Sequence, residues 1–356
     1  MTTTAPATRP GPESPVRTPG AAARRRRRLA AGLVVCVVVL VAAVAASLAL
    51  GARPVPLDDV WSSLWHPVPG NADDTAVHDL RLPRTVVGAL AGLLLAFGGT
   101  VIQGVTRNPL GDPGLLGIQH GSSLAVVLAI ALLGVTDPGG YVWFAFAGAA
   151  FAVAVVYGVA GTGRGGATPV KLALAGAAFA AAMTSLITLV LLMDPSTLDQ
   201  YRFWSVGSLA GRSMDVVRPV LPFAIVGVVL TVAVARTLDL LALGDDLARG
   251  LGQHLVRARV LSAVAVVLLC GSATALAGPL VFVGLVVPHL ARRFTGPDHR
   301  WLLAYAAFLG PALVLVADVV GRLVLRPAEL QVGIVVSVLG APLLIAIVRR
   351  KGVAGL

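Results

Sequence analysis

The sequence has few charged residues, few cysteines and few aromatic residues. Only 13% of its 356 residues are charged, whereas a soluble domain carries about 25%. Hydrophobic residues make up 57%, and the mean hydropathy is +0.87. Cys36 and Cys270 both lie inside apolar runs, so neither a disulfide framework nor a thiolate metal site is supported. The composition indicates a membrane protein with no bound cofactor.

Metal and nucleic-acid sites find little support. The six histidines are scattered singly, which gives no cluster of metal ligands. The net charge of +11 would suit a nucleic-acid partner. However, the basic residues form short groups between apolar runs, and few aromatic side chains could stack on bases, which is typical of arginines that mark cytoplasmic loops. We therefore expect no nucleic-acid binding.

Ten apolar stretches predict membrane-spanning helices. They lie at 29–50, 83–105, 118–135, 141–160, 168–193, 216–238, 258–277, 279–292, 301–325 and 332–349. An even number puts both termini on one side, where 20 Lys and Arg residues fall against 8 on the other. By the positive-inside rule both termini are then cytoplasmic. The eighth stretch is the weakest, because it is short and contains Pro279 and Pro288.

Residues 1–28 are predicted to form a disordered basic cytoplasmic tail. Residues 1–23 are rich in Thr, Ala, Pro and Gly without an apolar period, and Arg24–Arg28 follow them. The alternative is a cleaved signal peptide, with small residues near Ala45 at the cleavage site. The apolar stretch 29–50 is longer than the roughly 7 to 15 residues of a signal sequence. This length favours a retained helix and a membrane domain over residues 29–350.

No energy source is visible in the chain. The segment GTGRGGAT at 161–168 nearly fits a phosphate-binding loop, but Ala167 stands where that loop needs a lysine, and no strand precedes it. We interpret it as a cytoplasmic turn. The one clear intramembrane carboxylate is Asp318, which we expect to pair with Arg322 four residues later. Uphill transport would therefore need another subunit.

The connection from Thr237 to Arg259 predicts a docking element for such a subunit. Leu243, Leu247, Leu251 and Leu255 recur every four residues, as on an amphipathic helix. Three glycines within it suggest two short helices near 238–257. A helix lying on the lipid surface is the alternative, but its polar face should be rich in Lys and Arg, and two acidic residues argue against it.

Arginines also lie on the side of the membrane opposite the termini, where the positive-inside rule predicts few of them. Pro83 suits the first turn of the second helix, which places Arg81 and Arg84 at its mouth. Arg322 and Arg326 end the ninth helix. One interpretation of these arginines is that their long side chains reach toward lipid headgroups, and the other is that they bind a partner protein.

Three ordered blocks carry a resemblance to a known family. They are LRLPRTVVGALAGLLLAFGGTVIQGVTRNPLGDPGLLG (80–117), GPLVFVGLVVPHLARRFTGPDHRWLL (278–303) and ADVVGRLVLRPAELQVGIVVSVLGAPLLIAIVRR (317–350). In this order they resemble the FecCD-type permeases, the membrane subunits of bacterial ATP-driven importers for iron-siderophores and cobalamin. The resemblance runs from about residue 30 to 350. It implies an all-α, polytopic fold of ten helices in the bacterial inner membrane, of the type II ABC importer class.

The resemblance also implies cargo, partners and site residues. The cargo would be a ferric siderophore. The partners would be two cytoplasmic ATP-binding subunits, an extracytoplasmic substrate-binding (lipo)protein, a second permease chain in a homo- or heterodimer, and membrane lipid. The residues that would dock the binding protein are Arg81, Arg84, Arg322 and Arg326. Those that would couple to the ATPase are Gly244, Asp245, Ala248, Leu251 and Gly252.

Other functions fit the sequence less well. The same machine could carry cobalamin or haem, since no set of side chains identifies one ligand. A self-sufficient secondary carrier is disfavoured by the lack of intramembrane acids. A membrane-embedded enzyme is disfavoured because no His, Asp and Glu cluster falls on adjacent helices.

Overall fold

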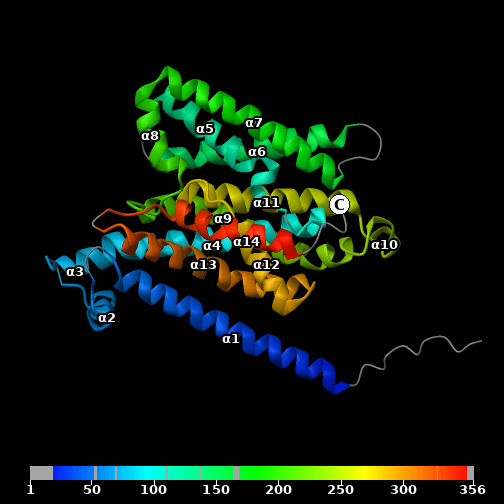
Figure 1. The fold of residues 1–356 in the computed structure, drawn as a ribbon, viewed down its shortest axis with the longest axis horizontal. Helices are drawn as coiled ribbons and strands as arrows, with labels where there is room; N and C mark the ends of the chain where they lie inside the picture. The colour runs from blue at the N-terminus through cyan, green and yellow to red at the C-terminus, as the bar shows by residue number, and fades with distance from the viewer. Residues whose placement is uncertain are drawn as a thin grey trace, which may run out of the picture.

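The chain forms a bundle of helices that run along the longest axis of the molecule (Figure 1). The computed structural model describes residues 19–51, 54–68, 70–109, 111–135, 138–162, 168–326 and 328–350. Within these ranges the secondary structure is entirely helical. Among the described residues, seven helices are long and apolar enough to cross a membrane by length and composition, and two further apolar helices are shorter.

All ten predicted stretches form helices. These are α1 (Pro19–Ala49), α4 (Leu82–Thr106), α5 (Ile118–Leu133), α6 (Pro138–Gly161), α7 (Pro169–Met193), α9 (Met214–Leu241), α11 (Leu255–Ala277), α12 (Val283–Thr295), α13 (His299–Val324) and α14 (Val332–Arg350). The weak eighth stretch becomes α12, which has 13 residues. The connecting helices are α2 (Leu57–Trp65), α3 (Ala72–Thr75), η1 (Ala76–Arg81), η2 (Pro113–Leu116), α8 (Pro195–Ser205) and α10 (Asp245–Gly250).

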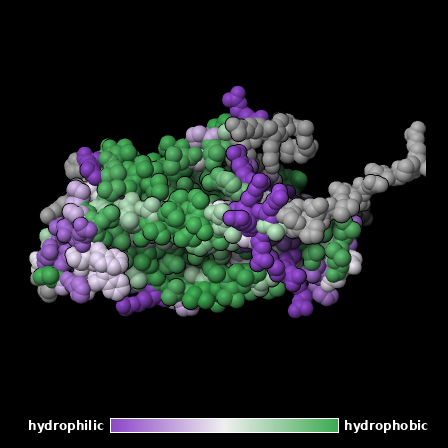
Figure 2. All heavy atoms as spheres, turned by 90° about the horizontal axis from the view of Figure 1, so that it is seen from below, coloured by the Kyte–Doolittle hydropathy of each residue, from purple (hydrophilic) through white to green (hydrophobic). Residues whose placement is uncertain are grey.

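Charge separates the two ends of the bundle. The start of α1, the end of α14 and α10 lie at one end, which we call the basic end (Figure 1). The other end carries α2, α3 and α8, and we call it the acidic end. Its carboxylates are Asp58, Asp59, Asp73, Asp74, Asp79, Asp194, Asp199, Asp215, Asp318 and Glu329. Figure 2 shows an apolar belt between hydrophilic ends, as expected of an integral membrane protein.

Helix α4 lies at the centre and packs on α13, α11, α12 and α9. Glycines allow its closest approaches. A Cβ on Gly92 would collide with the carbonyl of Gly310 in α13, and one on Gly99 with the carbonyl of Gly284 in α12. Small residues let helices approach closely in lipid, where the hydrophobic effect does not drive helices together. The packing role inferred for glycine from the sequence applies here.

Helix α1 begins earlier than predicted. The sequence placed the start of this helix at Leu29, after a disordered tail, but α1 begins at Pro19, so Arg24–Arg28 lie on the helix. Residues 1–18 lie outside the described residues. Alanine and arginine are strong helix formers, which explains why the helix extends through this run. Only 17% of the apolar window of α1 is buried, so most of it faces outward from the bundle.

Candidate functional site

A buried ion cluster joins three segments at the acidic end. The Asp318 carboxylate on α13 is fully buried. The Arg84 guanidinium on α4 donates to both of its oxygens at 2.8 to 3.1 Å, and Arg322 lies 3.0 Å from it. Arg84 also donates to Glu329, in the segment before α14, at 2.7 Å. The predicted pair Asp318–Arg322 is confirmed, whereas Arg84 and Glu329 were not foreseen as its partners.

Three arginines hold the end of α1. Arg322 donates to the carbonyls of Ser47 and Leu50 at 3.0 and 2.7 Å. Arg81 donates to those of Leu48 and Ala49 at 2.6 and 2.9 Å. In addition, Arg326 donates to the Gly51 carbonyl at 2.8 Å. The last carbonyls of a helix lack partners within it and carry partial negative charge, so cations stabilise this end.

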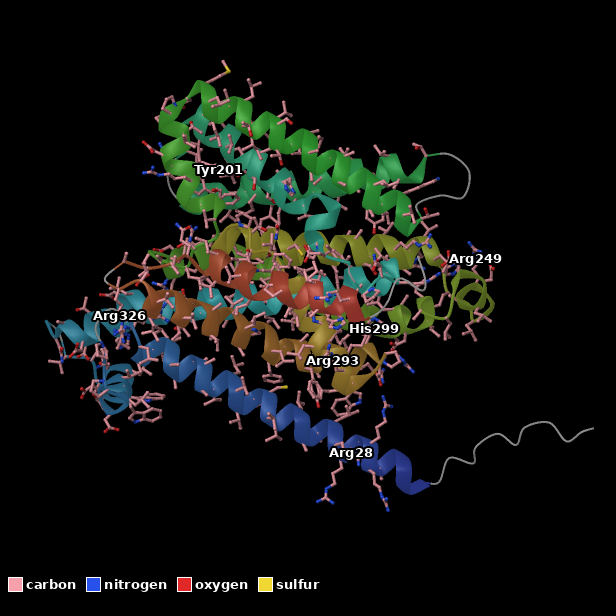
Figure 3. The ribbon with its side chains drawn as sticks, viewed as in Figure 1. Arg28, Tyr201, Arg249, Arg293, His299 and Arg326 are labelled. Atoms are coloured by element: carbon pink, nitrogen blue, oxygen red, sulfur yellow. The ribbon has the colours of Figure 1, made fainter. Side chains whose placement is uncertain are left out.

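The four arginines predicted to dock a binding protein therefore differ in accessibility. Arg81 and Arg322 are buried, with relative exposures of 8% and 3%. The side chain of Arg84 is 13% exposed. Arg326 is exposed and lies at the acidic end in Figure 3. Burial gives Arg81 and Arg322 a structural role that the sequence did not predict, and leaves Arg84 and Arg326 as the members that a partner could reach.

A second ion cluster anchors α10 at the basic end. Arg107 directly follows α4 and has a left-handed backbone with φ of 51°. Its side chain donates to the Leu241 carbonyl at 2.7 Å and pairs with Asp245. The other oxygen of Asp245 accepts from Arg259 on α11 at 2.8 Å. We call Arg107, Asp245 and Arg259 the α10 junction, and it ties α10 to both α4 and α11.

The junction stays ionised at neutral pH. Partial burial raises the pKa of the Asp245 carboxyl, but the guanidinium groups of Arg107 and Arg259 outweigh it and hold that pKa below its ordinary value. A lowered carboxyl pKa keeps the anion down to lower pH than in the unfolded chain. The interaction is therefore lost only when the pH falls through that lowered value.

The surface of α10 is apolar on one side. Leu243, Leu247 and Leu251 are 55 to 62% exposed, whereas Ala248 is fully buried against the bundle. Gly244 and Gly252 flank the helix with positive φ values of 109° and 82°, which favour glycine. The prediction of two short helices here is wrong. One helix of six residues stands between α9 and α11, because the first half of the segment continues α9 to Leu241.

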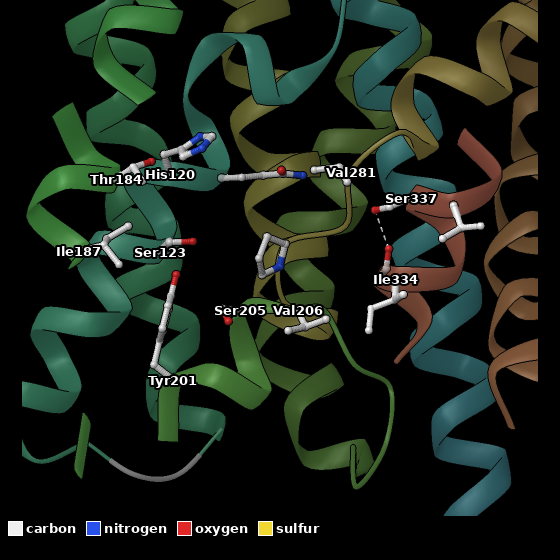
Figure 4. A pocket seen from close by; sticks show the side chains of 14 residues that line it. His120, Ser123, Thr184, Ile187, Tyr201, Ser205, Val206, Val281, Ile334 and Ser337 are labelled. Atoms are coloured by element: carbon white, nitrogen blue, oxygen red, sulfur yellow. Dashed lines mark hydrogen bonds between the residues drawn. The ribbon is translucent and has the colours of Figure 1, made fainter. Parts of the chain in front are cut away.

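A central cavity of about 520 Å³ opens between α5, α7, α8 and α14 (Figure 4). Among the residues that the structure describes, no lysine, arginine or carboxylate lines it. Its polar lining consists of Gln119, His120, Ser123, Thr184, Tyr201, Ser205 and Ser337. The amide of Gln119 holds the adjoining loop by donating to the Leu280 carbonyl at 2.8 Å. The sequence analysis did not identify these residues, although the polar run QHGSS at 119–123 inside an apolar stretch could have done so.

An outer cavity of about 530 Å³ lies toward the acidic end. Arg84, Glu329, Gln200 and Arg212 line it. The chain segments around residues 206–208 and 331–333 contribute to both cavities. The Gly333 amide donates to the Gly207 carbonyl at 3.2 Å and so joins these two segments. The phosphate-loop-like segment at 161–168 lies mostly outside the described residues.

Comparison with known proteins identifies the family. A model of the FecCD transport family matches residues 39–350. The chain belongs to this family. It is therefore a permease subunit of the ABC importer class and an integral membrane protein, as the sequence predicted. In this chain, Arg84 lies near the start of the central helix α4, and Arg107 directly follows its end.

Two relatives are similar in sequence to this chain over most of its length. It is 42% identical over 307 residues to the ferric enterobactin transport system permease protein of Escherichia coli (strain K12), which covers 86% of this chain and 91% of that protein. It is 40% identical over 305 residues to the iron(3+)-hydroxamate import system permease protein of Bacillus subtilis (strain 168), which covers 86% and 79%.

A solved structure has the same fold. It is a metal-chelate type ABC transporter in an inward-facing conformation, with a TM-score of 0.78 and 25% identity, covering 89% of this chain and 98% of that one. The predicted all-α permease fold is confirmed.

Proposed function

We propose that this chain is the membrane-spanning permease subunit of an ATP-driven importer that moves ferric siderophores into a bacterial cell. The observation that carries the proposal is the similarity along most of the chain to permeases named for ferric enterobactin and iron(3+)-hydroxamate import. A third relative, 36% identical over 306 residues, is named for Fe(3+)-citrate import in Bacillus subtilis (strain 168). The cargoes in all three names are chelates of ferric iron.

The central cavity is the proposed route for the chelate. Its hydroxyl, amide and imidazole groups can exchange hydrogen bonds with a polar ligand. Since no lysine, arginine or carboxylate is found among the described lining residues, these residues would not hold the cargo by a fixed ion pair. Weak, neutral contacts suit a passage from which the ligand must leave. A second permease chain, identical or related, is proposed to close the side of the cavity left open here.

The basic end is proposed to face the cytoplasm and to bind the ATPase through α10. Three leucines exposed on a helix outside the membrane core form an apolar surface that suits a protein partner. The α10 junction would pass movement of the docked helix to α4 and α11. The predicted coupling residues then have different roles. Gly244 and Gly252 shape the turns on either side of α10. Asp245 and Ala248 anchor the helix to the bundle, and Leu251 is exposed to the partner.

The acidic end is proposed to receive an extracytoplasmic binding protein. Arg84 and Arg322 contact Asp318, Arg84 also contacts Glu329, and Asp73 acts on Arg81, so three carboxylates partly offset the four arginines and leave a net charge of 4 − 3 = +1. Complementary charge across an interface favours association and fixes its orientation. Arg84 and Arg326 are proposed to contact the partner, while Arg81 and Arg322 hold α1 behind them.

Uptake by cells tests the function. Cells with and without this chain are offered labelled ferric siderophores, cobalamin and haem in parallel. We expect only ferric siderophore uptake to depend on the chain. Dependence of cobalamin or haem uptake instead would change the cargo, and transport in vesicles without any ATPase would indicate a secondary carrier.

A paired substitution tests the route. Ser337→Trp should fill the central cavity and abolish uptake, whereas Ala154→Trp, at an exposed position on α6, should not. Both proteins should reach the membrane at equal levels. Normal uptake by the Ser337→Trp protein would place the route elsewhere. Reporter fusions at the C-terminus and between α5 and α6 should report opposite sides of the membrane.

A further inference from the structure

Seven arginines gather at the basic end, where α1 passes α12. Five of them, Arg24–Arg28, lie on α1, and Arg292 and Arg293 lie on α12. Figure 3 shows Arg28 and Arg293 on these neighbouring helices. Figure 2, which views the molecule from the side of α1, shows hydrophilic side chains gathered at this end of the apolar belt. We call these seven residues the arginine patch.

The patch is held in place by contacts between the two helices and α13. Arg25 donates to the carbonyl of Thr295, in the last turn of α12, at 3.0 Å. One turn further along α1, the carbonyl of Leu29 accepts from the hydroxyl of Tyr305 on α13 at 2.8 Å, and Leu29 is buried. These bonds fix the start of α1 beside α12, so the arginines form a defined surface.

The charge of the patch is not balanced by the protein. In the parts of the chain that the structure describes, no Asp or Glu lies within ion-pair distance of any of the seven arginines. The arginines of the α10 junction and of the acidic-end cluster, in contrast, all have carboxylate partners. Arg24–Arg28 are consecutive and cover more than one full turn of α1, so only some of them face α12, and the unbalanced guanidinium groups on that side, together with those of α12, favour an anionic ligand.

An apolar surface adjoins the patch. Phe294, the residue after Arg293, is 63% exposed. Along α1, Val34, Val35 and Val38 are each more than 60% exposed. Such side chains on a membrane helix lie against acyl chains. The arginines thus begin where the apolar face of α1 ends, which is the level of the lipid phosphates.

We propose that the arginine patch binds anionic phospholipid, with the headgroup phosphates on the guanidinium groups of α1 and α12 and the acyl chains along Phe294 and the exposed valines. Arginine binds phosphate oxygens through paired N–H donors. Because the cations lie on two helices, a lipid with two phosphates, such as cardiolipin, fits better than a lipid with one. Basic surfaces between membrane helices on the cytoplasmic side bind such headgroups in general.

The patch fits lipid better than an acidic protein. Its arginines are continuous with the outward apolar face of α1, and acyl chains cover an apolar face of this kind in a membrane. The proposed ATPase-binding leucines lie on α10, a different element of the basic end. The site therefore goes beyond the transport role and would stabilise the position of α1 in the assembled importer.

Lipid retention by matched variants tests the proposal. The test variant is Arg28→Gln/Arg293→Gln. The control is Arg236→Gln/Arg300→Gln, which removes two exposed cations from the same end without touching the patch. The full chain, purified with its associated subunits, is titrated with cardiolipin or phosphatidylcholine, and bound lipid is counted by native mass spectrometry at low and high salt.

We expect cardiolipin to bind the wild type and the control equally and to bind the test variant roughly thirty-fold more weakly, since each cation near an anionic surface contributes about a factor of five. High salt should weaken cardiolipin binding to the wild type. This arm of the test does not depend on whether the variants fold. Equal binding by test and control variants, or equal binding of phosphatidylcholine, would overturn the proposal. So would displacement of the lipid by millimolar inorganic phosphate, or loss of ATPase from the test variant while its lipid remains.

Discussion

Asp318→Asn should destabilise the permease strongly, because it removes the carboxylate that contacts both Arg84 and the buried Arg322. The substituted amide keeps the shape of the side chain but not its charge. Among the described residues, Arg322, at 3% exposure, forms an ion pair with Asp318 alone and would lose it, and its Nε has no hydrogen-bond partner there. Arg84 would keep Glu329, which is partly exposed. Most of the cost should therefore arise at Arg322.

The expected size follows from this burial. Removing one partner of a buried ion pair costs about 3–5 kcal/mol, because an uncompensated charge stays in a poorly solvated site. Asp215→Asn is the control, since Asp215 and Arg218 are both about 80% exposed and surface pairs contribute little. The double variant Asp318→Asn/Arg322→Met should recover part of the loss, since it removes the stranded charge with its partner.

Unfolding in mixed detergent micelles, followed by circular dichroism, measures these differences. The free energy of unfolding should fall for Asp318→Asn and stay near the wild-type value for Asp215→Asn. An Asp318→Asn protein as stable as the wild type would refute the reasoning, since it would mean that water reaches these guanidinium groups. The same result would return Arg322 to the set of accessible docking residues.

Three further substitutions separate the proposed docking surfaces. Leu251→Asp should abolish co-purification of the ATPase without unfolding the chain, whereas Asp246→Asn, on an exposed side chain, should leave it intact; equal co-purification would exclude α10 as the docking surface. Arg326→Glu should weaken binding-protein association at low salt at least tenfold, because like charges across an interface cost more than 1.4 kcal/mol, and Arg218→Glu serves as its control. Asp245→Asn should keep ATPase binding but slow transport, which uptake at matched ATPase occupancy would reveal.

The helices could be predicted from the sequence because each membrane-spanning segment needs its own apolar run. A chain in lipid must satisfy its backbone within each spanning segment, so every span needs a continuous apolar run. The error at the start of α1 has a local cause as well. The Pro, Gly and Thr residues near the N-terminus predict disorder, but residues 21–28 are alanines and arginines, which favour helix. Propensity was the better guide over this run.

Ion pairs could be predicted from the sequence only where both partners lie on the same helix. Spacing of four residues placed Asp318 and Arg322 on one face, and the pair is present. The contact of Arg84 with Asp318 joins positions 234 residues apart, and it depends on α4 lying beside α13. Likewise, nothing in the sequence distinguishes Arg107 from other loop arginines. Its left-handed backbone places it where glycine or asparagine is usual, and only the fold shows that its side chain reaches α10.

Helix α4 connects the ion clusters at the two proposed docking surfaces. Arg84 near its start binds Asp318 of α13, and Arg107 after its end binds Asp245, the first residue of α10. Between them, glycine contacts at Gly92 and Gly99 press its backbone against α13 and α12 without intervening side chains. Close-packed interiors transmit strain rather than absorb it. If movement of α10 reaches the acidic end through α4, Asp245→Asn and Arg84→Gln should be non-additive in binding-protein release, although they lie far apart. Additive effects would show that the two ends respond independently.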